Sequence, residues 1–158
     1  MAAGKSSIGR FLAKKTHKKF YDSDDEIEKK TGVNVRWIFD LEGEAGFRLR
    51  ETAMIAELVK HSNIVLATGG GAIVEAENRK LLTKNGIVIY LKVSVESQLK
   101  RLEQDEKRPL LDVPDRHDVL TNLLVEREVL YRKIANFTVE TDNRSIASVA
   151  EEILNALR

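Results

Sequence analysis

Four short apolar segments, separated by longer helical patterns, are the feature that most constrains the fold of this chain. They cover residues 20–21, 64–67, 87–91 and 137–141. Continuous apolar runs favour strands that are buried on both faces, as they are in parallel sheets. Strands that alternate with helices predict a three-layer α/β domain with a parallel sheet. The helical patterns lie near 5–15, 24–31, 44–61, 75–83, 95–104, 118–135 and 145–157.

The bulk properties of the chain exclude several classes of protein. A length of 158 residues fits a single domain over 1–158, and 42% hydrophobic residues suffice for a sizeable core. A formal net charge of +1 gives no reason to expect a nucleic-acid partner. The absence of cysteine excludes disulfides and thiolate catalysis. Because no apolar run approaches the ~18 residues of a membrane span and no signal-peptide stretch is present, we expect a cytoplasmic protein without a membrane partner.

The first helical pattern begins with Gly4-Lys5-Ser6-Ser7, which matches the second half of the phosphate-binding motif G-x-x-x-x-G-K-[ST]. A helix N-terminus attracts phosphate, lysine adds a point charge, and the serine hydroxyl binds magnesium. An ordinary helix start is the alternative. The motif's first glycine and the strand that should feed it would precede Met1. We therefore expect a late-assigned start codon or a fragment, with a truncated inactive natural variant as the alternative.

Two carboxylates, Asp22 and Asp24, lie two residues apart at the end of the first strand. Residues at this spacing in an extended chain point the same way. One carboxylate can therefore hold magnesium, directly or through water, while the other takes a proton from an attacking hydroxyl. The alternative is a helix N-cap, in which Asp24 and Asp25 complement the helix dipole.

Three further patterns suggest an acceptor site. Arg48 and Glu51 are spaced for an ion pair on one helix face, although a surface pair is the alternative. The run 69–71 is three glycines after a strand, which predicts a ligand close to bare backbone N–H groups rather than a simple tight turn. Residues 101–116 hold both prolines amid dense charge. This suits a mobile loop that carries arginine to phosphate, with a solvated surface loop as the alternative.

Together these motifs resemble the shikimate kinase family over essentially the whole chain. The resemblance implies a doubly wound P-loop α/β fold with a five-stranded parallel sheet, whose first, central strand is absent here. It also implies ATP and shikimate as substrates, Mg²⁺ as cofactor, a role in aromatic amino acid biosynthesis and a monomer. The motifs that carry it are 3–10, 20–24, 39–44 with Phe47-Arg48 and Glu51, 67–71, 107–111, and 126–127 with Leu130-Tyr131.

The resemblance assigns a role to each matching position. Lys5, Asp24 and Arg108 should be catalytic, and Ser6 and Asp22 should hold the metal, with Arg108 on a lid over about 103–117. The nucleotide should contact Ala3, Gly4, Lys5, Ser6, Ser7, Arg101, Arg108 and Arg144. Shikimate should contact Asp24, Arg48, Gly70, Gly71, Arg127, Glu51, Phe39 and Phe47, with Glu51 orienting Arg48.

Loss of a central strand would expose two strand edges, so we expect the chain as written to be weakly active or inactive. Two rival functions stay open. A gluconate kinase or another P-loop small-metabolite kinase would share the phosphate half of the motif set, but would not need two arginines aimed at one carboxylate. A truncated, non-catalytic nucleotide-binding module is the other rival.

Overall fold

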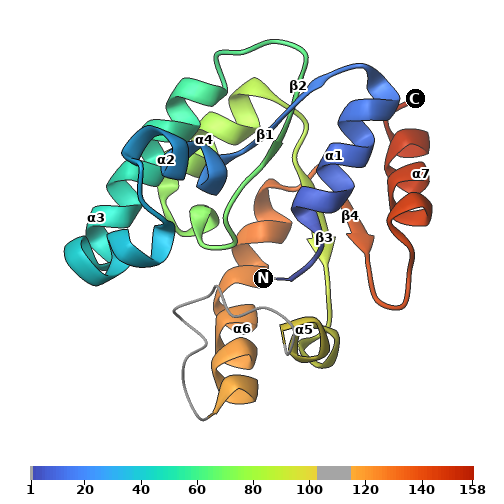
Figure 1. Ribbon diagram of the computed structural model, residues 1–158. Coiled ribbons are helices and arrows are strands. Elements are labelled where there is room, and N and C mark those ends of the chain that lie inside the picture. Colours follow the sequence, from blue (N-terminus) through green and yellow to red (C-terminus); the bar gives the residue numbers. More distant parts are fainter. Residues whose placement is uncertain (1, 103–114) are drawn as a thin grey trace.

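The computed structural model describes residues 2–102 and 115–158. Helices and strands follow the predicted order, with one short 3₁₀-helix (η1) added (Figure 1). Within the described ranges no helix is long and apolar enough to cross a membrane. The elements are α1 (Lys5–Thr16), β1 (Lys19–Asp22), α2 (Ser23–Thr31), α3 (Val35–Leu58), β2 (Ile64–Ala67), η1 (Ala72–Val74), α4 (Ala76–Asn85), β3 (Ile89–Lys92), α5 (Val95–Leu102), α6 (Arg116–Ile134), β4 (Phe137–Glu140) and α7 (Ile146–Ala156).

All four predicted strands are present and pair in parallel, but they form two pairs rather than one sheet. β1 lies beside β2, with Lys19 opposite Ile64, and β3 lies beside β4, with Ile89 opposite Phe137. The bounds of β2 match the expected ones, and those of the other strands differ by at most two residues at either end.

Helices cover both faces of the strands, which confirms the three-layer prediction. On one face, a core of α1 and α7 side chains packs on Val65 of β2, on Ile89 and Leu91 of β3, and on Val139 of β4. Tyr90 lies between Ile89 and Leu91 and therefore points to the opposite face. There it stacks on Tyr131 of α6, with the ring centroids 4.7 Å apart. Because α1 and α7 contact both strand pairs, the pairs belong to one layer.

The third helix begins nine residues earlier than the expected start at residue 44. The side chain of Asn34 accepts a hydrogen bond from the Trp37 backbone N–H at 2.8 Å, so it caps the new first turn. Gly43 interrupts the helix with φ 70° and ψ −177°, a conformation that favours glycine. Arg50 spans this kink through two hydrogen bonds to the Glu42 carboxylate, at 2.8 and 2.6 Å. The kink breaks the helical periodicity, which is why the sequence-based prediction missed the first part.

Candidate active site

The phosphate-binding end of the site is the start of α1. Gly4 precedes the helix with φ 82°, and no side chain caps the first turn. Uncapped N–H groups at a helix N-terminus are donors for an anion. Arg101 holds the backbone just before the helix, since its guanidinium donates to the Ala2 carbonyl at 2.8 Å and to the Thr141 carbonyl at 2.9 Å. The predicted phosphate loop is therefore anchored to the end of β4.

Ser6 and Asp22 converge in the way that the metal prediction requires. The Ser6 hydroxyl donates to Asp22 Oδ2 at 2.5 Å, and Asp22 Oδ1 accepts from the Asp24 backbone N–H at 3.1 Å. A hydroxyl and a carboxylate are oxygen ligands of the kind that Mg²⁺ prefers. The described residues contain no cluster of three or more acidic or histidine side chains placed to hold a metal. This donor set fits Mg²⁺, which usually keeps several waters and binds substrate phosphates.

Arg48 and Glu51 of α3 form a buried ion pair, so the surface-pair alternative is wrong. Arg48 Nη1 donates to Glu51 Oε2 at 2.6 Å, and the Glu51 residue is 0% exposed. Burial raises the pKa of Glu51 from 4.5 to about 7, against the opposing effect of the Arg48 charge. Arg48 Nη2 also meets Glu44 at 3.1 Å, so two acidic residues orient its guanidinium.

The glycine run 69–71 lies directly against these charged side chains. A Cβ at Gly71 would be 2.1 Å from Arg48 Nη2, and one at Gly69 would be 2.8 Å from Glu51 Oε1 and 3.1 Å from Asp24 Oδ1. Real Cβ atoms do not approach other atoms so closely, so the run is more than a tight turn. The expected contacts of Gly70 and Gly71 with a ligand stay predictions. Within the protein, the missing side chains leave room for the site's own charged groups.

α6 brings Arg127 and Tyr131 to the same glycine run. Arg127 is 7% exposed, hydrogen-bonds with Tyr131 and lies close enough to Glu51 to lower its pKa. The Tyr131 hydroxyl donates to the Gly70 carbonyl. Burial raises the pKa of this tyrosine, so it keeps its proton and acts as a donor. Sequence analysis gave Tyr131 no role, although its i,i+4 spacing from Arg127 places both on one helix face.

Ser23 is a second residue of the site that sequence analysis missed. It is fully buried, and its hydroxyl accepts a hydrogen bond from the Gly69 backbone N–H at 3.3 Å. This bond joins the end of β1, which carries the two aspartates, to the end of β2. No spacing in the sequence indicates it, because the partners are 46 residues apart.

Two phenylalanine rings border the buried ion pair, and their contact with an acceptor stays a prediction. The rings of Phe39 and Phe47 lie 4.6 Å apart with an interplanar angle of 32°, and Phe47 is buried. The Arg48 guanidinium carbon lies 5.4 Å from the centre of the Phe47 ring. A cation held against an aromatic face and a carboxylate keeps a fixed orientation.

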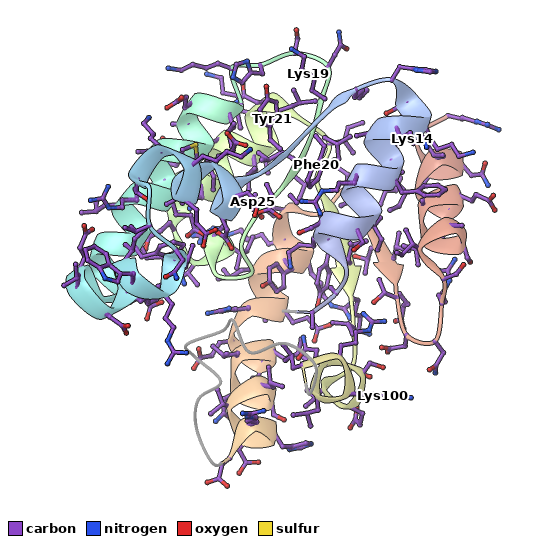
Figure 2. All side chains as sticks on the ribbon, viewed as in Figure 1. Lys14, Lys19, Phe20, Tyr21, Asp25 and Lys100 are labelled. Atoms are coloured by element: carbon purple, nitrogen blue, oxygen red, sulfur yellow. The ribbon has the colours of Figure 1, made fainter. Side chains whose placement is uncertain are left out.

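Asp25 faces away from this cluster, toward Arg10 of α1. Arg10 Nη2 lies 3.3 Å from Asp25 Oδ2, and the same guanidinium lies over the Phe20 ring. Asp25 and Phe20 are labelled in Figure 2. The adjacent aspartates therefore differ, since Asp24 lies beside the glycine run and Asp25 forms an exposed ion pair.

One small cavity lies beside the phosphate end and the glycine run, between the ends of β2 and β3. It has a volume of about 100 Å³, and its lining includes Ala3 and Lys5 as well as Gly69, Gly70 and Tyr131. The distant motifs of the sequence analysis are thus brought together. Arg108 and most of the expected lid lie outside the described residues. Arg144 bonds to the Ser148 carbonyl and Glu152 of α7, so its contact with a nucleotide stays a prediction.

Replacing Glu51 by glutamine should flatten the dependence of stability on pH. A pKa raised on folding means that the stabilisation from this group is present below pH 4.5 and is lost as pH rises through about 7. The shift corresponds to about 3 kcal/mol. Denaturant titrations measure the free energy of unfolding at pH 5 and at pH 8. Its decrease from pH 5 to pH 8 should be larger for the parent chain than for Glu51→Gln. Equal drops would show that Glu51 titrates at an ordinary pKa.

Comparison with known proteins agrees with this geometry. A sequence model of the shikimate kinase family matches residues 1–158. Shikimate kinase of Buchnera aphidicola subsp. Schizaphis graminum is 53% identical over 159 residues, covering 99% of this chain and 91% of the relative. Shikimate kinase of Francisella tularensis subsp. novicida is 54% identical over 154 residues, covering 97% of this chain and 88% of the relative.

Solved structures agree as well. Shikimate kinase from Acinetobacter baumannii, solved in complex with shikimate, has a TM-score of 0.97 and 48% identity, covering 99% of this chain and 88% of that one. Shikimate kinase from Bacteroides thetaiotaomicron has a TM-score of 0.91 at 29% identity, and the match covers 99% of this chain and 93% of that one. The predicted P-loop kinase type of α/β fold is thereby confirmed. The chain belongs to the shikimate kinase family.

Proposed function

We propose that this chain transfers the γ-phosphoryl group of ATP to the 3-hydroxyl of shikimate, a step of aromatic amino acid biosynthesis. The observation that carries the proposal is the convergence at the glycine run of the Asp24 carboxylate and the buried Arg48–Glu51 pair, next to the Ser6–Asp22 contact at the start of α1. We further propose that it acts as a cytoplasmic monomer, without a membrane or nucleic-acid partner.

The acceptor is bound through its carboxylate. The Arg48 and Arg127 guanidiniums, both nearly buried, form the clamp, because their planar forks match a carboxylate. Glu51 holds Arg48 in orientation at 2.6 Å. Phe39 and Phe47 line the apolar side of the ring, and the backbone at Gly70 and Gly71 contacts its hydroxyls.

Asp24 acts on the attacking hydroxyl. Its backbone is fixed by the hydrogen bond to Asp22, and its carboxylate lies against Gly69. As the 3-hydroxyl oxygen bonds to the γ-phosphorus and the bond to the bridging oxygen of ADP breaks, the hydroxyl proton passes to Asp24. Asp24 thus positions the nucleophile and serves as general base.

The phosphate end provides positive charge. Lys5 and the first N–H groups of α1 bind the β- and γ-phosphates, together with Ala3, Gly4 and Ser7. Ser6 and Asp22 hold Mg²⁺, which when bound neutralises phosphate charge. Arg108 contacts the transferring group, and Arg101 and Arg144 lie near the nucleotide base.

Shikimate-dependent release of ADP, with magnesium and ATP, tests this proposal. Gluconate is the control acceptor, because a gluconate kinase would not need two arginines at a carboxylate clamp. We expect turnover with shikimate and none with gluconate. If the chain as written is inactive, the same assay is applied to the extended chain described in the Discussion. Failure with shikimate there as well would overturn the kinase assignment.

Tyr131→Phe should raise the KM for shikimate by about two- to tenfold while changing kcat little, because one neutral hydrogen bond to the Gly70 carbonyl is lost. The phenyl ring keeps the stack on Tyr90. Steady-state kinetics over a range of shikimate concentrations checks this. Tyr90→Phe is the matched control, since it removes a hydroxyl from the same stack. An equal effect of both substitutions would mean that loss of a hydroxyl from either ring raises the KM, and that the Gly70 contact is not specifically responsible.

A further inference from the structure

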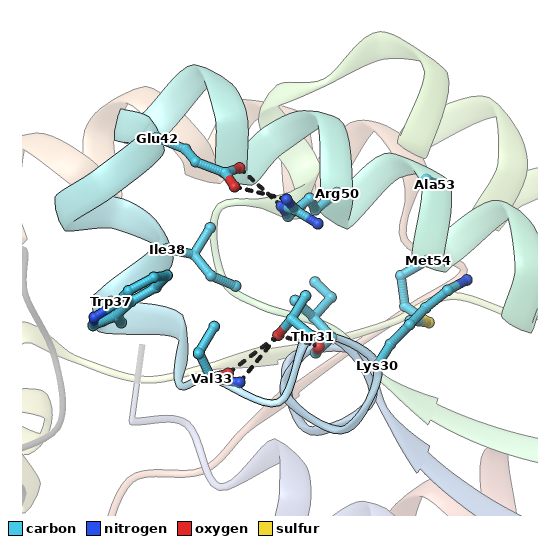
Figure 3. Close-up of a pocket in the computed structure, with 10 residues that line it drawn as sticks. Lys30, Thr31, Val33, Trp37, Ile38, Glu42, Arg50, Ala53 and Met54 are labelled. Carbon is cyan, nitrogen blue, oxygen red and sulfur yellow. Dashed lines mark hydrogen bonds and ion pairs between the residues drawn. The ribbon is translucent and has the colours of Figure 1, made fainter.

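A second cavity lies between α2 and α3, on the opposite side of α3 from the active site (Figure 3). Arg50 and Ala53 line it. Arg50 is two residues from Arg48, and Ala53 is two residues from Glu51. Each therefore lies about 200° around the helix from that active-site residue. Its volume is about 450 Å³, against about 100 Å³ for the cavity beside the phosphate loop. The function proposed above uses none of its lining residues.

The floor and walls of this cavity are apolar. Ile27, Ile38 and Met54 form the floor and are nearly fully buried, while Val33 and Ala53 add to the walls. Trp37 stands at the edge and is 52% exposed, an unusual position for so large an apolar ring. An aromatic ring placed here could stack on Trp37 and contact the Met54 thioether, and both contacts are favourable.

The charged side chains that line the rim are Lys30, Arg50 and Glu42, and Glu57 lies beside them, bonded to Lys30. Arg50 uses Nε and Nη2 for its bonds to Glu42, and among the described residues Nη1 has no partner. The Lys30 amine bonds to Glu57 at 2.6 Å, which leaves two of its three donors. A carboxylate placed between the two cations would accept hydrogen bonds from these remaining donors.

We propose that this cavity binds a small aromatic carboxylate, with its ring on the floor beside Trp37 and its carboxylate between Arg50 and Lys30. A nucleotide or a sugar would leave the apolar floor uncovered, and a polyanion would be repelled by the Glu42 and Glu57 carboxylates that already pair with the two cations. The cavity separates the helix that carries Asp24 from the helix that carries Arg48. A ligand there would therefore lie between the two elements that supply the acceptor site.

Trp37 provides a direct test, because it is the chain's single tryptophan. The probe is 3-phenylpropionate, and its neutral amide, 3-phenylpropanamide, is the matched ligand control. Titration should quench or shift the Trp37 emission in a saturable way, with the amide binding about tenfold more weakly. Because this readout does not involve ATP or turnover, its failure is distinguishable from failure of the proposed kinase function.

Two variants locate the binding. Arg50→Met should weaken binding of the carboxylate about tenfold, and Ala53→Leu should block both ligands by filling the cavity. Arg132→Met is the matched control, because Arg132 makes the same two-donor contact with Glu128 on α6 and should bind the probe like the parent chain. Thermal melts show whether each variant is folded. The proposal is overturned by a lack of saturation, by equal affinity for acid and amide, or by an equal loss in Arg132→Met.

Discussion

Asp24→Asn should lower the kcat for shikimate phosphorylation by about 10²- to 10⁴-fold, the usual contribution of a positioned general base. Asparagine preserves the shape of the side chain and can still hydrogen-bond a hydroxyl, but it cannot accept the proton. The hydrogen bond from the residue 24 backbone N–H to Asp22 does not depend on the side chain. We therefore expect little change in the KM for shikimate. Steady-state kinetics with both substrates varied, together with a thermal melt, measures the effect.

Asp25→Asn is the matched control for this substitution. It removes a carboxylate one residue away, in the same first turn of α2, where the contact is with Arg10 at 3.3 Å. An exposed ion pair of this kind contributes little to stability, so kcat should stay within about twofold of the parent value. A kcat for Asp24→Asn above a tenth of the parent value, or an equal loss in Asp25→Asn, would contradict the assignment of the base.

The fold could be predicted from the sequence wherever local pattern decides structure. Continuous apolar runs located β2 and β3, because a parallel strand buried on both faces has little polar sequence in it. The short pair Phe20-Tyr21 indicated β1, and the alternation over 137–141 indicated β4, in which Thr138 and Glu140 are exposed. The segment 35–42 was missed for a local reason. Gly43 at φ 70° turns the helix axis, so the periodicity on its two sides does not continue in phase. The cap at Asn34 was the signal that could have identified this helix.

The candidate site could be predicted in part, and the missing part has a physical reason. Arg48 and Glu51 are three residues apart on one helix, so their spacing alone brings them into contact. Tyr131 meets Gly70 across 61 residues, and Ser23 meets Gly69 across 46. Such contacts depend on how helices and strands pack, which no local spacing encodes. The glycine run was correctly singled out as more than a turn. The atoms that occupy the space of the missing side chains include those of Arg48, Glu51 and Asp24.

The division of the strands into two pairs adds an open inner edge to each pair, on β2 and on β3. The Lys19 N–H donates to the Asn63 carbonyl, so alternate residues of β2 bond to β1, while Ile64 and Leu66 direct their backbone groups to the other edge. The Asn136 N–H likewise donates to the Val88 carbonyl, so Ile89 and Leu91 direct theirs away from β4.

The open edges of β2 and β3 border the same cavity. The small cavity beside the phosphate loop is lined both by Thr68, Gly69 and Gly70 after β2 and by Val88–Leu91 at β3. The four strand residues that direct backbone groups there are only partly buried, whereas strands inside a parallel layer are normally covered on both faces. Unpaired edges and half-exposed apolar side chains are both unfavourable.

An extension before Met1, made of five apolar β-branched residues followed by Gly and one further residue, should therefore stabilise the chain strongly. It would pair with β2 and β3 together and complete the phosphate-binding motif up to Gly4-Lys5-Ser6. Hydrogen bonds on two edges and new apolar burial should contribute on the order of 5 kcal/mol after the cost of ordering the segment. For a domain of this size that corresponds to a rise in melting temperature of about 10–20 °C. Calorimetry of both chains measures it.

The control is an extension of equal length in which serine and aspartate replace the five apolar residues and the glycine is kept. It adds the same backbone and the same loop, but it cannot cover an apolar layer. If both extensions raise the melting temperature equally, the stabilisation comes from the loop and not from strand pairing. If neither does, the edges of β2 and β3 are already satisfied in solution and the two pairs form a stable layer by themselves. A rise in melting temperature with the apolar extension alone, accompanied by faster shikimate-dependent ADP release, would have one explanation. Pairing of the added strand with β2 and β3 would then both stabilise the strand layer and hold the phosphate loop in its active conformation.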